Sequence, residues 1–346
     1  MTTVMRAKEA AATSPATNRP GNASKPRYAL WLTGGLVVVA ALALWSITVG
    51  TANMSVRDIL TGNASAEQLR VLTVSRIPRT IAIILSGASM AVAGLVMQML
   101  VQNRYVEPST TGVTESAGLG VLVVTFVFPG ASIMAKMGFS VVFALAGTML
   151  LLALIRSIPH RDVIVVPLLG IVLSGVIGAG ATFLAWQFQL QGTLQAWTTG
   201  DFSGVLKGRY ELLWVVAGAS AITYFFADRF TVAGLGEDLA RNLGLNHARL
   251  TMLGLTIVAI VAGIVTVVAG ALPFLGLVVP NIVSLIMGDY MRRSLPFVAM
   301  GGAVFVLVAD IIGRSIIAPA EIPVGVVMGI VGGAIFLFIL LRTVKQ

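Results

Sequence analysis

Apolar runs long enough to cross a bilayer constrain the fold of this chain more than any other feature. The first covers residues 28–49, and nine more follow it along the chain. They lie at approximately 80–101, 112–128, 133–155, 163–188, 211–227, 250–270, 273–288, 295–317 and 323–341. An α-helix of about 20 apolar residues spans the hydrocarbon core, where the backbone must satisfy its own hydrogen bonds. The sequence therefore predicts an all-α integral membrane protein, a bundle of about ten transmembrane helices.

The composition agrees with this fold class and excludes several kinds of chemistry. Hydrophobic residues make up 57% of the chain and charged residues 11%, whereas a soluble domain has roughly 45–50% and 25%. The chain has no cysteine, so disulfides, thiolate metal sites and cysteine nucleophiles are excluded. The net charge of +9 comes from basic residues spread between the apolar runs rather than gathered in one patch. Membrane lipid is therefore an expected partner, and nucleic acid is not.

The distribution of basic residues predicts how the chain is oriented. Residues 1–27 are rich in Ala, Thr, Ser and Pro, a composition typical of a disordered tail, and residues 28–346 form a single transmembrane domain. If the tail is cytoplasmic, about 15 of the 23 Lys and Arg residues lie in the tail and the cytoplasmic loops, as the positive-inside rule requires. We expect a multi-pass membrane protein with both termini in the cytoplasm.

Motifs for catalysis or cofactor binding are not found. No lysine precedes Ser or Thr, so the phosphate-binding loop of ATPases is missing. His160 and His247 fall in expected loops without other ligands at metal-binding spacing, and no metal or cofactor is expected. Nearly all carboxylates also fall in loops. The exception is Asp310, four residues before Arg314 in the ninth span, where neutralising that arginine is its simplest role.

A polar segment at about 228–249 separates the sixth and seventh spans. Glu237 and Asp238 suit a helix N-terminus, Leu239 and Leu243 share one face, and Gly244 suits a C-terminal stop. This pattern predicts a short cytoplasmic amphipathic helix. Its apolar face meets either a partner protein or the chain's own bundle.

Small residues recur four apart in two spans. They are Gly325, Gly329 and Gly333 in the last span, and Gly170, Ser174, Gly178 and Thr182 in the fifth. Such stripes let helix backbones approach closely. They serve either packing within one subunit, or a transport pathway or dimer seam.

Several ordered motifs resemble one family of membrane proteins. Around the second span these are Arg76-Ile-Pro-Arg79, Gly87-Ala-Ser-Met-Ala-Val-Ala-Gly94, Gln98, Asn103, Glu107-Pro108 and Gly112-Val113. Later in the chain they are Gly236-Glu237, Ala240-Arg241, Leu243-Gly244, Phe274-Leu-Gly-Leu-Val-Val-Pro280, Ala309-Asp310 with Arg314, and Pro319-Ala-Glu-Ile-Pro-Val-Gly325. Over about residues 55–341 the chain resembles the permeases of iron-siderophore and cobalamin ABC importers. One departure is Asn281, where the family often has His, so a titrating role is not expected there.

The resemblance implies a transport subunit of the bacterial cytoplasmic membrane and not an enzyme. The expected function is to move a ferric siderophore from a binding protein across the membrane, with ATP hydrolysis on separate subunits. The implied partners are a second permease, identical or paralogous, two ATPase subunits and an extracytoplasmic binding protein. A haem or cobalamin importer permease is the alternative within the family. A secondary transporter driven by an ion gradient is the alternative outside it, and the scarcity of carboxylates in the spans argues against that.

Three groups of site residues follow from these considerations. The resemblance implies that the ATPase is coupled through Gly236, Glu237, Asp238, Leu239, Ala240, Arg241, Leu243 and Gly244. It implies that the binding protein docks on Arg76, Arg79 and Arg314. Near the outer end of the fifth span lie Gln187, Gln191, Gln195 and Trp197. This last group lines either a polar, aromatic vestibule for a large chelate or an interfacial belt.

Overall fold

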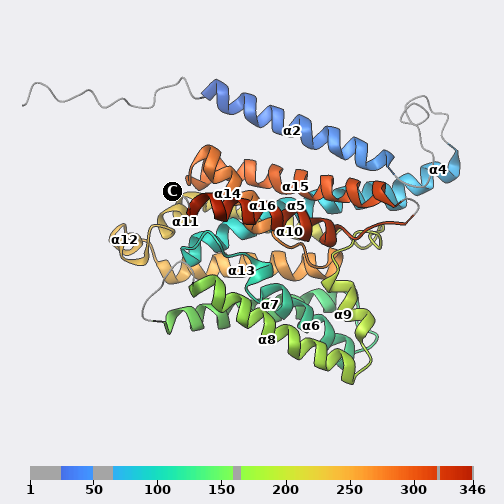
Figure 1. Ribbon diagram of the computed structural model, residues 1–346, viewed down its shortest axis with the longest axis horizontal. Coiled ribbons are helices and arrows are strands. Elements are labelled where there is room, and N and C mark those ends of the chain that lie inside the picture. The colour runs from blue at the N-terminus through green and yellow to red at the C-terminus, as the bar shows by residue number, and fades with distance from the viewer. Residues whose placement is uncertain (1–24, 50–64, 159–164, 318–319, 345–346) are drawn as a thin grey trace, which may run out of the picture.

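Helices make up most of the residues that the computed structural model describes, which are 25–49, 65–158, 165–317 and 320–344 (Figure 1). The first half contains α2 (Lys25–Thr48), α4 (Ala66–Val71), the π-helical turn η1 (Leu72–Arg76), α5 (Ile77–Val101), the 3-10 turn η2 (Pro108–Thr110), α6 (Val113–Val127), α7 (Ile133–Arg156) and α8 (Val165–Gln187). The second half contains α9 (Gln191–Thr198), α10 (Leu213–Phe225), α11 (Ala227–Ala233), α12 (Glu237–Asn242), α13 (His247–Ala269), α14 (Leu275–Met287), α15 (Met291–Ile316) and α16 (Val324–Val344).

Seven helical segments in the described residues are long and apolar enough to cross a membrane. Three shorter apolar helices, α6, α10 and α14, have 15, 13 and 13 residues, below the roughly 20 that a straight crossing needs. The expected count of about ten thus corresponds to seven full spans and three shorter helices. The expected tail at 1–27 lies outside the described residues except for its last three, with which α2 begins.

Helix α5 lies at the centre of the bundle, where it packs against α15, α13, α14 and α10. Glycines let it approach two of these neighbours at backbone distance. A Cβ at Gly94 would stand 2.3 Å from the Cα of Gly276 in α14, and one at Gly87 would stand 2.7 Å from the carbonyl oxygen of Gly302 in α15. The Gly87–Gly94 motif is therefore a packing motif, as expected where helices gain no hydrophobic drive from lipid.

The two stripes of small residues also pack within the chain. A Cβ at Gly325 would meet the Thr199 carbonyl oxygen at 2.3 Å, and Gly333 faces the Phe274 ring. In α8, Gly170 packs against Thr111. Gly325, Gly333 and Gly170 thus pack within one subunit, whereas Ser174, Gly178 and Thr182 of the α8 stripe line a cavity.

The bundle has two distinct ends in Figure 1. Helix α12 and the C-terminal end of α16 lie at one end, and α4 lies at the other. Along one side runs α2, which packs mainly on α15 and exposes apolar side chains such as Leu30, Trp31 and Leu44. An exposed apolar surface of this kind suits contact with lipid.

Candidate functional site

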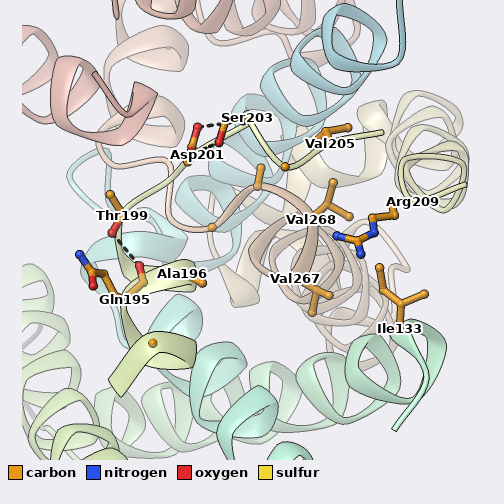
Figure 2. Close-up of a pocket in the computed structure, with 14 residues that line it drawn as sticks. Ile133, Gln195, Ala196, Thr199, Asp201, Ser203, Val205, Arg209, Val267 and Val268 are labelled. Carbon is orange, nitrogen blue, oxygen red and sulfur yellow. Dashed lines mark hydrogen bonds between the residues drawn. The ribbon is translucent and has the colours of Figure 1, made fainter. Parts of the chain in front are cut away.

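A cavity of about 490 Å³ opens where α9 meets the start of α7 and the end of α13. In Figure 2, Gln195 and Arg209 lie on opposite sides of it. The Thr199 hydroxyl donates to the Gln195 carbonyl oxygen at 2.6 Å, and the Ser203 amide donates to Asp201 Oδ1 at 2.8 Å. These hydrogen bonds fix the loop that forms one wall of the cavity.

A second cavity of about 430 Å³ lies between α6, α8 and α9. Gln191, Gln195 and Trp197 line it together, so the structure brings three of the four vestibule residues of the sequence prediction to one place. The fourth, Gln187, is exposed at the end of α8 and does not line this cavity. The Trp197 ring lies over Gly118, where a Cβ would stand 2.3 Å from the indole.

Between these cavities and α16, three segments cross and hold one another by backbone hydrogen bonds. Ala271 N donates to the Trp197 carbonyl oxygen at 2.8 Å, Asp201 N to that of Ala269 at 2.7 Å, and Gly325 N to that of Gly200 at 2.8 Å. Gly200 has φ +66, and a Cβ there would stand 2.1 Å from the Ala271 carbonyl oxygen. We call this arrangement the Gly200 junction; it needs glycine for both conformation and space.

Buried charges form a cluster near the ends of α2, α5 and α15. Asp310 Oδ1 accepts from Arg79 Nη2 at 2.8 Å, and its Oδ2 pairs with Arg314 Nη2 at 2.5 Å. Arg79 Nη1 also pairs with Glu321 Oε2 at 2.7 Å. Arg314 further donates to the carbonyl and hydroxyl oxygens of Ser46, at 2.9 and 2.8 Å. The expected pairing of Asp310 with Arg314 is confirmed, and Asp310 proves to join two arginines.

The three arginines predicted to dock the binding protein therefore differ in accessibility. Arg79 and Arg314 are only 8% and 4% exposed, and both have partners within the chain. Arg76 is half-buried and donates to the carbonyl oxygen of Val49. With three arginines against Asp310 and Glu321, the cluster keeps a net positive charge at this end of the bundle.

The predicted amphipathic helix is present as α12, at the opposite end (Figure 1). Glu237 and Asp238 occupy its first turn, and Glu237 pairs with Arg241 at 3.2 Å. Gly244, at φ +76, follows the helix as the expected stop. Ala240 alone is buried against the chain.

The apolar face of α12 points away from its own bundle. Leu239 and Leu243 are 43% and 61% exposed, and Leu235, four residues earlier, is 64% exposed. Leu235 precedes Gly236, whose φ of +120 lies outside the helical region, so helical spacing does not relate it to the other two. Leu239 and Leu243 form the α12 leucine row, an exposed apolar strip on an otherwise polar helix.

A polar cluster beside α12 fixes the base of this segment. Asp228 of α11 pairs with Arg292 of α15 at 2.7 Å and accepts from the Tyr290 hydroxyl at 2.8 Å. These hydrogen bonds, first from Tyr290 and then from Arg292, hold the pKa of Asp228 below its usual value. The carboxylate thus stays charged and ties α11 to α15.

Motif residues near the second span satisfy backbone groups that helices leave unpaired. Pro280 lies inside α14 and has no N–H for the Gly276 carbonyl; Gln98 Nε2 donates to that oxygen at 3.1 Å. Glu107 Oε1 accepts from Phe274 N at 2.8 Å at the start of α14. Asn281 Nδ2 donates to the carbonyl oxygens of Arg104 and Leu277 at 2.9 and 2.7 Å. These side chains have structural roles.

Asp310 is not alone among the described carboxylates outside loops, because Glu115 also lies in an apolar helix. Glu115 lies in the first turn of α6, and Glu107 is 1% exposed in the segment before it. Glu107 lies in a loop as expected, but it is buried. Both residues stand close to the boundary of an apolar run, where a solvent-exposed loop position is the ordinary interpretation. Their burial comes from the packing of α8, α9 and α14 around them.

These features define a polytopic helical transport subunit, with a polar cavity towards one end and an exposed apolar strip at the other. The chain belongs to the FecCD transport family, whose model matches residues 36–342, and it is a permease rather than an enzyme.

Similar proteins agree with this assignment. The petrobactin import system permease YclN of Bacillus subtilis is 42% identical over 306 residues, covering 88% of this chain and 96% of its own. The ferric-anguibactin transport system permease FatD of Vibrio anguillarum is 40% identical over 271 residues, covering 78% and 86%. A metal-chelate type ABC transporter solved in an inward-facing conformation shares the fold, with a TM-score of 0.76 and 22% identity over 91% of this chain and 99% of the other.

Asp310→Asn should destabilise the protein far more than Glu321→Gln. Asp310 is fully buried between two arginines, and removing its charge leaves Arg314 without a counter-ion and Arg79 with Glu321 alone, at a cost of about 3–5 kcal/mol. The Glu321 side chain is 35% exposed, so its loss should cost about 1 kcal/mol or less. Thermal unfolding of the purified protein in detergent measures both. Equal shifts in Tm for the two variants would contradict the central role given to Asp310.

Proposed function

We propose that this chain is the permease subunit of an ABC importer that carries a ferric siderophore inward from a binding protein. Family membership and the two siderophore permeases at 40–42% identity support the substrate class. The observation that carries the proposal is the polarity of the bundle. One end has the cavity beside α9 and the net-positive cluster around Asp310, and the other has the exposed α12 leucine row.

The α12 leucine row is the surface proposed to dock the ATPase. Leu239 and Leu243 contribute exposed apolar area on a helix that is otherwise polar, which is the composition of a helix that lies in a partner's groove. Ala240 and the Asp228 cluster anchor the segment to the bundle, so movement of the partner is transmitted to α11 and α15. The ATPase end is then cytoplasmic, as is the C-terminal end of α16 (Figure 1).

The opposite end is proposed to receive the binding protein. Arg79 and Arg314 supply positive potential while fixed inside the cluster, and Arg76 is the arginine best placed to meet a carboxylate of the partner. An arginine remains charged at any working pH and pairs bidentately with carboxylates. The complete importer is proposed to hold two permeases, identical or paralogous, and two ATPase subunits.

Uptake into proteoliposomes tests the function. The permease is reconstituted with its ATPase and binding protein, and ferric siderophores, haem and cobalamin are offered singly. ATP-dependent accumulation of a ferric siderophore that survives an uncoupler is the expected result. Accumulation of haem or cobalamin alone would show that the substrate is one of these and not a siderophore. Uptake that collapses with the ion gradient would overturn the ABC assignment.

Replacing Leu239 and Leu243 together by Asp should uncouple the permease from its ATPase. Two charges placed in an apolar contact must be desolvated without partners, so co-purification should fall at least about tenfold. Both positions are exposed, so the fold should persist. Leu206→Asp, at an exposed leucine outside α12, is the matched control and should bind normally. Wild-type binding and transport by the double variant would refute docking at this row.

Arg76→Glu should slow association with the binding protein, because charges at the rim of an interface mainly set encounter rate. We expect about a tenfold lower rate at low salt, a difference that shrinks as salt screens the charges. Arg70→Glu changes an exposed arginine of α4 and controls for net charge. Stopped-flow association in nanodiscs across a salt series gives the rates. If Arg76→Glu and Arg70→Glu behave alike, Arg76 has no specific docking role.

A further inference from the structure

Glu115 carries a buried carboxylate oxygen that the fold leaves unused. The side chain lies in the first turn of α6, where the helix dipole favours a negative charge, and the Ser174 hydroxyl faces the carboxyl group. Its Oε2 is nevertheless buried without a hydrogen-bond partner among the residues that the structure describes. Glu107 differs, since Phe274 N and the Ser109 hydroxyl both donate to its Oε1. A buried carboxylate oxygen without a donor is costly unless something else supplies one.

The cavity of about 430 Å³ between α6, α8 and α9 lies directly in front of Glu115. Gly178 of α8 leaves this space open, because a Cβ there would only just contact Glu115 Cγ, at 3.9 Å. The wall also carries the hydroxyls of Thr182 and Thr198 and the amide of Gln191. Among the described residues, the lining holds no Lys or Arg, so the wall of this cavity brings no counter-charge to the carboxylate.

Trp197 provides a second, independent sign of a missing ligand. It is 5% exposed, and its Nε1 has no acceptor within the described part of the chain. Its ring is fixed over Gly118, one turn along α6 from Glu115, so indole and carboxylate lie on the same side of that helix. An aromatic ring beside a carboxylate and hydroxyl groups is a favourable environment for an ammonium group.

A neighbouring cavity has the opposite charge. Lys136 and Arg209 line it, and Trp197 lines both cavities. The tryptophan therefore stands between an acidic space and a basic one. A ligand that extends across both cavities would therefore place its positive end beside Glu115 and its negative end beside Lys136 and Arg209.

We propose that the cavity beside Glu115 is a subsite for a positively charged, hydrogen-bond-donating arm of the transported chelate, above all a primary ammonium group. The ammonium donates to Glu115 and lies against the Trp197 ring, and a neighbouring oxygen of the chelate accepts from Trp197 Nε1. This inference deepens the proposed function and rests on it for the identity of the ligand as cargo. Glu115 thereby determines specificity among chelates.

Equilibrium binding tests the subsite without requiring transport. The permease with its ATPase in nanodiscs is dialysed against two gallium-loaded trihydroxamate chelates, one with a terminal primary amine and one with that amine acetylated. Wild type should bind the amine form at least about tenfold more tightly, the effect of one charge-assisted hydrogen bond. Glu115→Gln should remove this preference and leave binding of the acetylated form unchanged. Glu211→Gln, at an exposed carboxylate that accepts from Gly208 N, should keep it.

A second variant guards against a folding defect in Glu115→Gln. Gly178→Val fills the cavity while leaving the carboxylate in place, and it should weaken binding of the amine form by at least about tenfold. Equal binding of both chelates by wild type, or equal losses for both in Glu115→Gln, would overturn the subsite. Selective binding in the absence of ATP-driven uptake would instead overturn the proposed transport function and leave the subsite standing.

Discussion

The hydrocarbon core of a membrane offers no water to unpaired backbone groups, and the irregular parts of this chain show how the fold meets that constraint. Pro280 breaks the hydrogen-bond ladder of α14, and the side chain of Gln98 supplies the missing donor. The Glu107 carboxylate accepts a hydrogen bond from a backbone N–H at the start of the same helix. Some of the residues that identify the family by sequence thus have a structural role: their side chains bond the backbone groups that short, interrupted helices leave unpaired inside the bundle.

Close packing and buried charge occur in different parts of the structure. Glycines bring α5 to backbone distance from α14 and α15, which leaves little space between the central helices. At their ends, the cluster around Asp310 joins α5, α15 and, through Ser46, α2. A fixed network presents positive potential without mobile side chains. The surface proposed for the binding protein therefore has its electrostatic character set before any partner arrives.

Much of the fold could be predicted from the sequence, because each apolar run carries its own local signal. The ten runs match helices whose ends differ by only a few residues, and α12 follows from its charges, leucines and terminal glycine. Contacts between distant segments could not be predicted. The pairing of Arg79 with Asp310 joins residues 231 apart, and the exposure of Glu115 to a cavity depends on where α8 and α9 lie. Periodicity along one helix contains no information about either.

The Gly200 junction has a mechanical consequence for any importer that alternates between outward and inward openings. Its three backbone hydrogen bonds tie the ends of α9 and α13 to the start of α16, and breaking them together would cost free energy with each bond. We therefore expect these helix ends to move together. Hinges then lie elsewhere, and α9, which forms one wall of each cavity, follows the start of α16 during the transport cycle.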